Sequence, residues 1–220
     1  MSRHQAPEEL LLDYAAGALP EGPSLAVSLH VALDPVARRT VQDFQAVGGA
    51  LLESESVPVF GEEFALEQAL AKIESVAVEA RPVPPKPVAG FEWAPPALLP
   101  YLGRTPRWHK AIGGFENIPI HIPGDNHRVE LLRLMPGRGL PQHHHTGNEY
   151  TIVMHGGFTD NTGNYGVGDF AMGPGATDHE PIADADDGQP CIALIVLERP
   201  IVLTGPWGRW FNPLVKRGWL

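Results

Sequence analysis

The chain has 220 residues, of which 43% are hydrophobic, so it is long enough for one large or two small domains with a packed core. Its formal net charge of −10 argues against direct nucleic-acid binding, because neutralising phosphates requires clustered Lys and Arg. The single cysteine, Cys191, excludes an internal disulfide and fits a reducing compartment. No apolar stretch approaches the roughly 20 residues of a membrane span, so we expect a cytoplasmic protein without a membrane partner.

Residues 1–78 have the apolar spacing of four helices. The first helix is expected to begin near Pro7, which fits a first turn, and to end at Gly17. The second helix should cover residues 24–33, with leucines at four-residue spacing along one side.

The third helix is predicted by a cap signal, because Asp34 fits an N-cap and Pro35 a first turn. The apolar side chains of the third and fourth helices recur every three or four residues: Val41, Phe44, Val47 and Leu51, then Leu66, Ala69, Leu70 and Ile73. Helices this short seldom bury much core alone, so we expect a partner to cover some of their apolar surface, with these candidate contacts: Leu25, Leu29, Phe44 and Leu51. The alternative is that the helices cap the domain that follows.

Residues 79–99 are predicted to form an extended linker, because they are rich in proline and cannot continue a helix. From residue 100 to residue 220 the pattern changes to short strands separated by Gly, Asn and Asp turns. The strands are expected at residues 118–122, 129–134, 150–155, 169–172 and 191–197. Many short strands at this spacing are typical of a double-sheet jelly roll. Aromatic residues near the C-terminus fit either a lid over this domain or a dimer surface: Trp207, Trp210, Phe211 and Trp219.

Four residues of the strand-rich part are candidate ligands of one divalent transition metal: His143, His145, Glu149 and His179. Side chains alternate faces along a strand, so His143 and His145 should point the same way and His144 the other. A turn at residues 146–148 can bring the carboxylate back to the imidazoles. Three imidazoles and one carboxylate suit zinc, iron, nickel, copper or manganese, and they leave room for water or a substrate.

The spacing of this segment resembles the two motifs of the cupin family. The pattern G-x5-H-x-H-x3-E-x6-G runs from Gly137 to Gly156, and Gly168, Pro174 and His179 approximate the second motif. With the first 78 residues included, the chain resembles the ChrR-type anti-sigma factors. The segments that carry the resemblance include Tyr14-Ala15-Ala16-Gly17, Ser24-Leu25-Ala26-Val27, Tyr101-Leu102-Gly103-Arg104, Arg107-Trp108 and Gly168-Asp169.

This resemblance implies an α+β multidomain protein: a small N-terminal helical bundle at residues 1–78, the linker, and a cupin double-stranded β-helix, or jelly-roll, barrel at residues 100–220. It also implies an N-terminal domain that binds an extracytoplasmic-function sigma factor. The cupin of that family takes part in the response to oxidative stress.

The N-terminal domain departs from the family in its zinc ligands. The family's two histidines match His4 and His30, but the positions of its Cys-x-x-Cys pair fall on Asp34 and Ala37. A degenerate site of His4, His30 and Asp34 cannot supply the four protein ligands of a closed structural zinc site, so N-terminal zinc is doubtful. The helices must then be held by docking on the barrel or on a second copy of the chain, which leaves a homodimer open.

The leading hypothesis is therefore an anti-sigma factor that senses an oxidant or small molecule at the cupin metal, with zinc ahead of iron, nickel or manganese. The alternative from another class is a metal-dependent dioxygenase or isomerase whose helices serve oligomerisation, and a third hypothesis is a small-molecule binding protein. No general base beyond the ligands is evident in the sequence. This favours the regulator over the enzyme.

Overall fold

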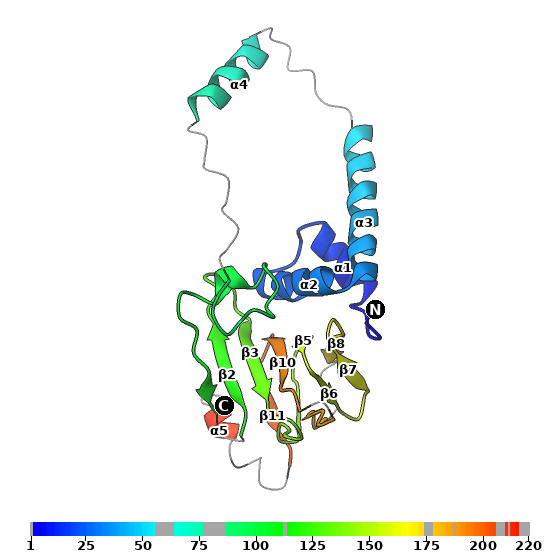
Figure 1. Cartoon of the computed structure of the whole chain (residues 1–220). Coiled ribbons are helices and arrows are strands. Elements are labelled where there is room, and N and C mark those ends of the chain that lie inside the picture. Colours follow the sequence, from blue (N-terminus) through cyan, green and yellow to red (C-terminus); the bar gives the residue numbers. More distant parts are fainter. Residues whose placement is uncertain are drawn as a thin grey trace.

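The protein was analysed in a computed structural model that describes residues 2–55, 64–76, 87–111, 114–173, 178–186, 188–205, 210 and 212–215. Helices come first in the chain and a strand-rich domain follows (Figure 1). The helices are α1 (Glu8–Ala15), α2 (Glu21–Leu33), α3 (Pro35–Ser54), α4 (Phe64–Ser75), a 3-10 turn η1 (Leu99–Tyr101) and the short α5 (Asn212–Val215).

The N-terminal helices start and end where local chemistry allows it. Gly17 has a φ of 69°, a left-handed conformation that ends the turn after α1 as predicted. Helix α2 begins at Glu21, earlier than expected, directly after Pro20. The Asp34 carboxylate accepts hydrogen bonds from the amides of Val36 (2.8 Å) and Ala37 (2.9 Å), which confirms the predicted cap of α3.

The strand-rich domain is a sandwich of antiparallel sheets. Its main sheet has six strands in the order β1-β2-β3-β10-β5-β8, opposed by a three-stranded sheet β7-β6-β9 and a two-stranded pair β11-β4. The strands are β1 (His109–Lys110), β2 (Glu116–Ile120), β3 (Arg128–Leu134), β4 (His143–His144), β5 (Glu149–His155), β6 (Gly157–Thr159), β7 (Asn164–Gly166), β8 (Phe170–Gly173), β9 (Ile182–Ala183), β10 (Cys191–Leu197) and β11 (Val202–Leu203). The predicted class, helices followed by a double-sheet domain, is confirmed.

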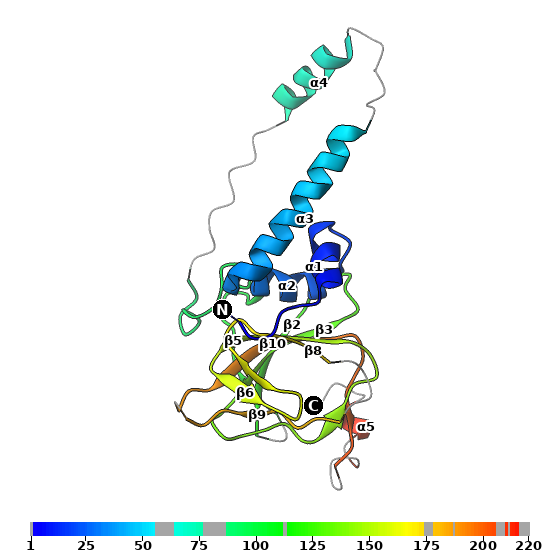
Figure 2. The ribbon, with the colours of Figure 1, turned by 90° about the vertical axis from the view of Figure 1, so that its right-hand side faces the viewer.

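Helix α2 is docked on the main sheet and shares its core. Leu25 and Leu29 of α2 are buried together with Ile152 of β5 and Val196 of β10 in one apolar cluster. Figure 2 shows α2 lying over the main sheet, with β6 and β9 on the far side of that sheet. The approach is close at Gly22, where a Cβ atom would meet Val129 Cγ2 at 3.1 Å. The helices therefore cap the barrel, which is one of the two arrangements expected for helices without structural zinc.

The segment after residue 86 also joins this core. Phe91 and Leu98 are buried in the same cluster as α2, and Tyr101 donates a hydrogen bond to Glu21 at 2.8 Å. The expected linker thus includes residues that pack against the folded domain. The predicted limits at residues 78 and 99 stay predictions, since residues 77–86 lie outside the described ranges.

Apolar side chains remain exposed on α3 and α4. We define the α3–α4 apolar surface as two separate helix faces that are 50% to 75% exposed: Val47, Leu51 and Leu52 on α3, and Leu66, Leu70 and Ile73 on α4. Both helices project away from the barrel in Figures 1 and 2. Among the described helices none has the length and apolar character needed to cross a membrane. Of the predicted C-terminal aromatic residues only Trp210 is described, and it is 73% exposed.

Candidate metal centre

Three backbone segments bring the predicted ligands together. His143 lies on β4, and its amide and carbonyl pair with those of His179 at 3.1 and 2.9 Å, which aligns the two side chains. His145 follows β4, and Glu149 opens β5 after a short turn. One ligand atom from each of the four residues lies within 4.8 Å of the others, so the group could hold a metal ion.

Hydrogen bonds fix the imidazoles of His143 and His179 in the tautomer that can bind a metal. Nδ1 of His143 lies 2.7 Å from the carbonyl oxygen of Pro141, which can only accept, so this nitrogen must carry the proton. Nδ1 of His179 lies 3.0 Å from Oδ2 of Asp160 and donates in the same way. Nε2 of each ring is therefore unprotonated and carries a lone pair that can bind a metal, because the hydrogen bond made by Nδ1 fixes the tautomer.

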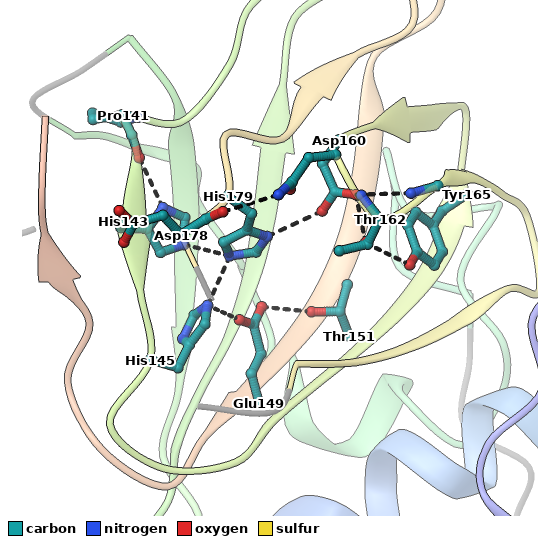
Figure 3. A network of polar contacts seen from close by, with 12 residues as sticks. Pro141, His143, His145, Glu149, Thr151, Asp160, Thr162, Tyr165, Asp178 and His179 are labelled. Carbon is teal, nitrogen blue, oxygen red and sulfur yellow. Dashed lines mark hydrogen bonds and ion pairs between the residues drawn. The ribbon is translucent and has the colours of Figure 1, made fainter. Parts of the chain in front are cut away.

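The free nitrogens converge on one point (Figure 3). Nε2 of His179 lies 3.0 Å from Nε2 of His143 and 2.8 Å from Nε2 of His145. The lone pairs of His143 and His179 repel each other at this distance, and a cation between them would remove the repulsion. In the same centre Nδ1 of His145 is buried without a hydrogen-bond partner, and Oε2 of Glu149 contacts Nε2 of His145 as an ion pair. This donor set fits a divalent transition metal.

Electrostatics also keep the ligands in their metal-binding forms. Burial, reinforced by the neighbouring His179, lowers the pKa of His143 to about 4, so its imidazole is neutral at pH 7. Burial alone would favour the neutral acid of Glu149, but the hydrogen bond and charge of His145 hold its pKa below the ordinary value. Oε1 of Glu149 accepts a hydrogen bond from the Thr151 hydroxyl at 2.7 Å. A neutral imidazole and an ionised carboxylate are the forms that metals require.

A cavity of about 190 Å³ opens beside the four candidate ligands. Its other walls are mainly apolar and come from both sheets, including Leu132, Phe158 and Ile195. Cys191 also lines it, but this side chain is buried, and burial raises the pKa of the thiol to about 12. The cavity can take a small, largely apolar molecule next to the candidate ligands.

Sequence reasoning missed the residues that support the candidate ligands. Asp160, which orients His179, sits in a turn where its Oδ1 accepts from the amides of Thr162 (2.8 Å) and Gly163 (3.1 Å). The available signal was the Asp-x-Thr-Gly order of residues 160–163, which favours such a turn but does not say what it contacts. His144 faces away from the cluster, as expected, with Nδ1 3.2 Å from Asp178.

The residues of the degenerate N-terminal zinc site are occupied by hydrogen bonds. Asp34 accepts from the amide and hydroxyl of Ser2 at 3.0 and 2.6 Å in addition to capping α3. Burial disfavours its charge, yet these bonds hold the pKa of Asp34 well below its usual range. Nδ1 of His30 lies 2.9 Å from the carbonyl of Gly168, and Nε2 accepts from the amide of Ala6 at 3.3 Å.

His4 completes the predicted N-terminal set but points elsewhere, with Nε2 3.1 Å from the carbonyl of Asn164. Within the described ranges, the group able to hold a metal is the one in the barrel, and His4, His30 and Asp34 do not form a second. Burial lowers the pKa of His30, so its imidazole is a neutral hydrogen-bonding group in the core.

The predicted partner contacts occupy different environments. Leu25 and Leu29 are 3% and 0% exposed because they face the barrel, and Phe44 is half-buried. Leu51 is 63% exposed and lies in the α3–α4 apolar surface. A partner can therefore reach Leu51 directly, whereas contact with the two leucines of α2 would require that helix to leave the barrel.

Comparisons with known proteins agree with both parts of the chain. Residues 104–195 match the family model of the ChrR cupin-like domain. The protein called anti-sigma-E factor ChrR from Cereibacter sphaeroides is 34% identical over 202 residues, 90% of this chain and 91% of that protein. The crystal structure of Rhodobacter sphaeroides SigE in complex with the anti-sigma ChrR contains a chain with 32% identity and a TM-score of 0.70, covering 89% of this chain and 98% of that one. The chain therefore belongs to the ChrR family of anti-sigma factors.

Proposed function

We propose that this protein sequesters an extracytoplasmic-function sigma factor through its N-terminal helices and senses an oxidant or small molecule at a metal in the barrel. The similarity to anti-sigma-E factor ChrR, and to a chain of the SigE–ChrR complex, supports the first half of the proposal. The expectation of a cytoplasmic location stays a prediction.

The observation that carries the proposal is the α3–α4 apolar surface. Leu66, Leu70 and Ile73 follow the spacing of one helix face, and each is at least 50% exposed. Large apolar side chains exposed together mark an interaction site in a soluble protein. Burying each of them against a partner would contribute about 1.5–3 kcal/mol.

For the sensing half, His143, His145, Glu149 and His179 are proposed to hold the ion, with zinc ahead of iron, nickel or manganese. A bound ion of this kind would supply a Lewis-acid position for an oxygen of a small ligand. The chain itself supplies the cavity of about 190 Å³ that admits such a ligand and limits its size.

Binding of the full chain to purified extracytoplasmic-function sigma factors of the same host tests the first half. Leu51→Asp should weaken the complex about tenfold or more, because it removes one buried apolar contact and introduces a charge. Gln45→Asp, an exposed position on the same helix, adds the same charge and should bind as the wild type does. Equal binding by both variants, or no binding by the folded wild type, would contradict the proposal.

The metal-enzyme alternative, a dioxygenase or isomerase, is favoured by the cavity beside the ligands. Metal analysis of the purified chain, followed by oxygen-consumption measurements with small apolar substrates, distinguishes the metal-dependent enzyme from the anti-sigma regulator. Sustained turnover without any sigma-factor binding would establish the enzyme instead of the regulator.

A further inference from the structure

A continuous series of contacts leads from the candidate metal ligands out of the cavity (Figure 3). Asp160 accepts from Nδ1 of His179 with one carboxylate oxygen, at 3.0 Å, and from the Thr162 hydroxyl with the other, at 2.6 Å. The Thr162 hydroxyl is also 2.9 Å from the phenol oxygen of Tyr165. The turn between β6 and β7 is thereby tied to the orientation of one metal ligand.

The far end of this series is the N-terminal segment of the chain. The ring of Tyr165 packs on the ring of His4 with 4.4 Å between their centroids. His4 also fills the space above Gly163, where a Cβ atom would lie 3.2 Å from Cε1 of the imidazole. His4 therefore packs on the barrel at the β6–β7 turn.

Residues 2–6 join the barrel to the helices. On the barrel side, Asp169 accepts from the amides of Arg3 and His4, and the amide of Phe170 donates to the His4 carbonyl at 3.0 Å. On the helix side, Ser2 bonds the cap of α3 at Asp34, and the amide of Ala6 donates to His30 of α2. A shift of this segment would therefore change how α2 and α3 pack on the sandwich.

We infer that metal loading of the barrel and docking of the N-terminal helices are coupled through His179, Asp160, Thr162, Tyr165 and His4. The inference rests on the proposed function, in which the metal centre governs what the helices bind. Without a cation, the facing Nε2 lone pairs of His143 and His179 push His179 away, and Asp160 loses the donor that ties its turn to the candidate ligands. With a cation, His179 keeps its position, and its hydrogen bond to Asp160 holds the β6–β7 turn against which His4 packs.

Coupling of this kind is reciprocal: docking of the helices raises metal affinity by the factor with which metal favours docking, so a change at His4 that weakens docking should lower metal affinity. Zinc affinity of the full chain can be measured by competition with a chelating dye. Thr162→Val and Tyr165→Phe should lower it about tenfold, the effect typical of removing a group that orients a ligand. His4→Ala, which touches none of the ligands, should lower it about fivefold.

Thr159→Val is the matched control. Thr159 lies on the same hairpin, and its hydroxyl donates to an aspartate, Asp184, at 2.9 Å and accepts from the Asn164 side chain at 2.8 Å, but neither bond reaches His179. Its zinc affinity should equal that of the wild type. Wild-type affinity in Thr162→Val, Tyr165→Phe and folded His4→Ala would overturn the inference, and if His4→Ala does not fold, the other two variants decide.

Hydrogen exchange gives a second readout that involves no sigma factor. Zinc should slow exchange at the amides of His4 and Phe170, and the slowing should be smaller in Thr162→Val than in Thr159→Val. Zinc binding that leaves these amides unchanged in the wild type would refute the coupling. The proposed sequestration would survive that result if Leu51→Asp still lost its sigma factor, so the two failures are distinguishable.

Discussion

Replacing Asp34 by Ala tests how the helices are held without N-terminal zinc. The substitution removes the cap of α3, worth about 1 kcal/mol, and leaves the amides of Val36 and Ala37 without their acceptor. It also removes two hydrogen bonds from Ser2 to a charged carboxylate, each worth about 1.5 kcal/mol at the low end of the usual range. We expect the free energy of unfolding to fall by about 2–4 kcal/mol.

Urea unfolding of the full chain at pH 7 with excess zinc measures this loss, and Asp43→Ala, at an exposed site on the same helix, is the control. The folded-state pKa of Asp34 lies below its unfolded value, so the stabilisation is present above about pH 4 and is lost as pH falls through the folded pKa. The difference between wild type and Asp34→Ala should therefore shrink in acid. A loss at pH 7 no larger than about 0.5 kcal/mol, the range of ordinary surface substitutions, would refute the reasoning.

Three further outcomes are expected. Leu29→Ala should cost about 2–5 kcal/mol in urea unfolding, because the side chain is fully buried between α2 and the sheet; a loss typical of a surface site would contradict this docking. Glu149→Gln should lower zinc affinity at least about tenfold in chelator competition, since the loss of even a supporting group has that effect, whereas Glu53→Gln, at an exposed site on α3, should leave it unchanged. Cys191 should resist alkylation at pH 8 until the chain unfolds, because burial raises its pKa to about 12; rapid labelling of the native protein would exclude a core thiol.

The sequence could indicate that the candidate ligands lie close together because the spacing of three of them is local. His143, His145 and Glu149 lie within one strand, one turn and the start of the next strand, and those elements follow from alternation and turn chemistry. Asp160 could not be predicted, because it meets His179 only after two separate hairpins fold against each other. The strand pattern likewise located the five longer strands to within two residues, while two- and three-residue strands such as β4 are too short to show alternation.

The helices illustrate a different limit. The spacing of Leu25 and Leu29 correctly indicates one apolar face, but periodicity does not say whether a partner or the chain's own barrel covers it. The cap at Asp34 was predictable because it depends on two adjacent residues, whereas its bonds to Ser2 join positions 32 residues apart. Local chemistry thus fixed where α3 begins, and tertiary packing decided what holds it.

Because hydrogen bonds to the barrel hold the N-terminal helices, these helices do not form a domain that is independent of the barrel. The acceptors for the Arg3 and His4 amides and for the His30 ring belong to Asp169 and Gly168, which lie between β7 and β8 of the barrel. Cutting the chain after residue 78 would leave those polar groups without partners and expose Leu29 to water. The helical part therefore depends on the barrel for its packing. A fusion of these helices to another sensor domain would have to include the β7–β8 turn.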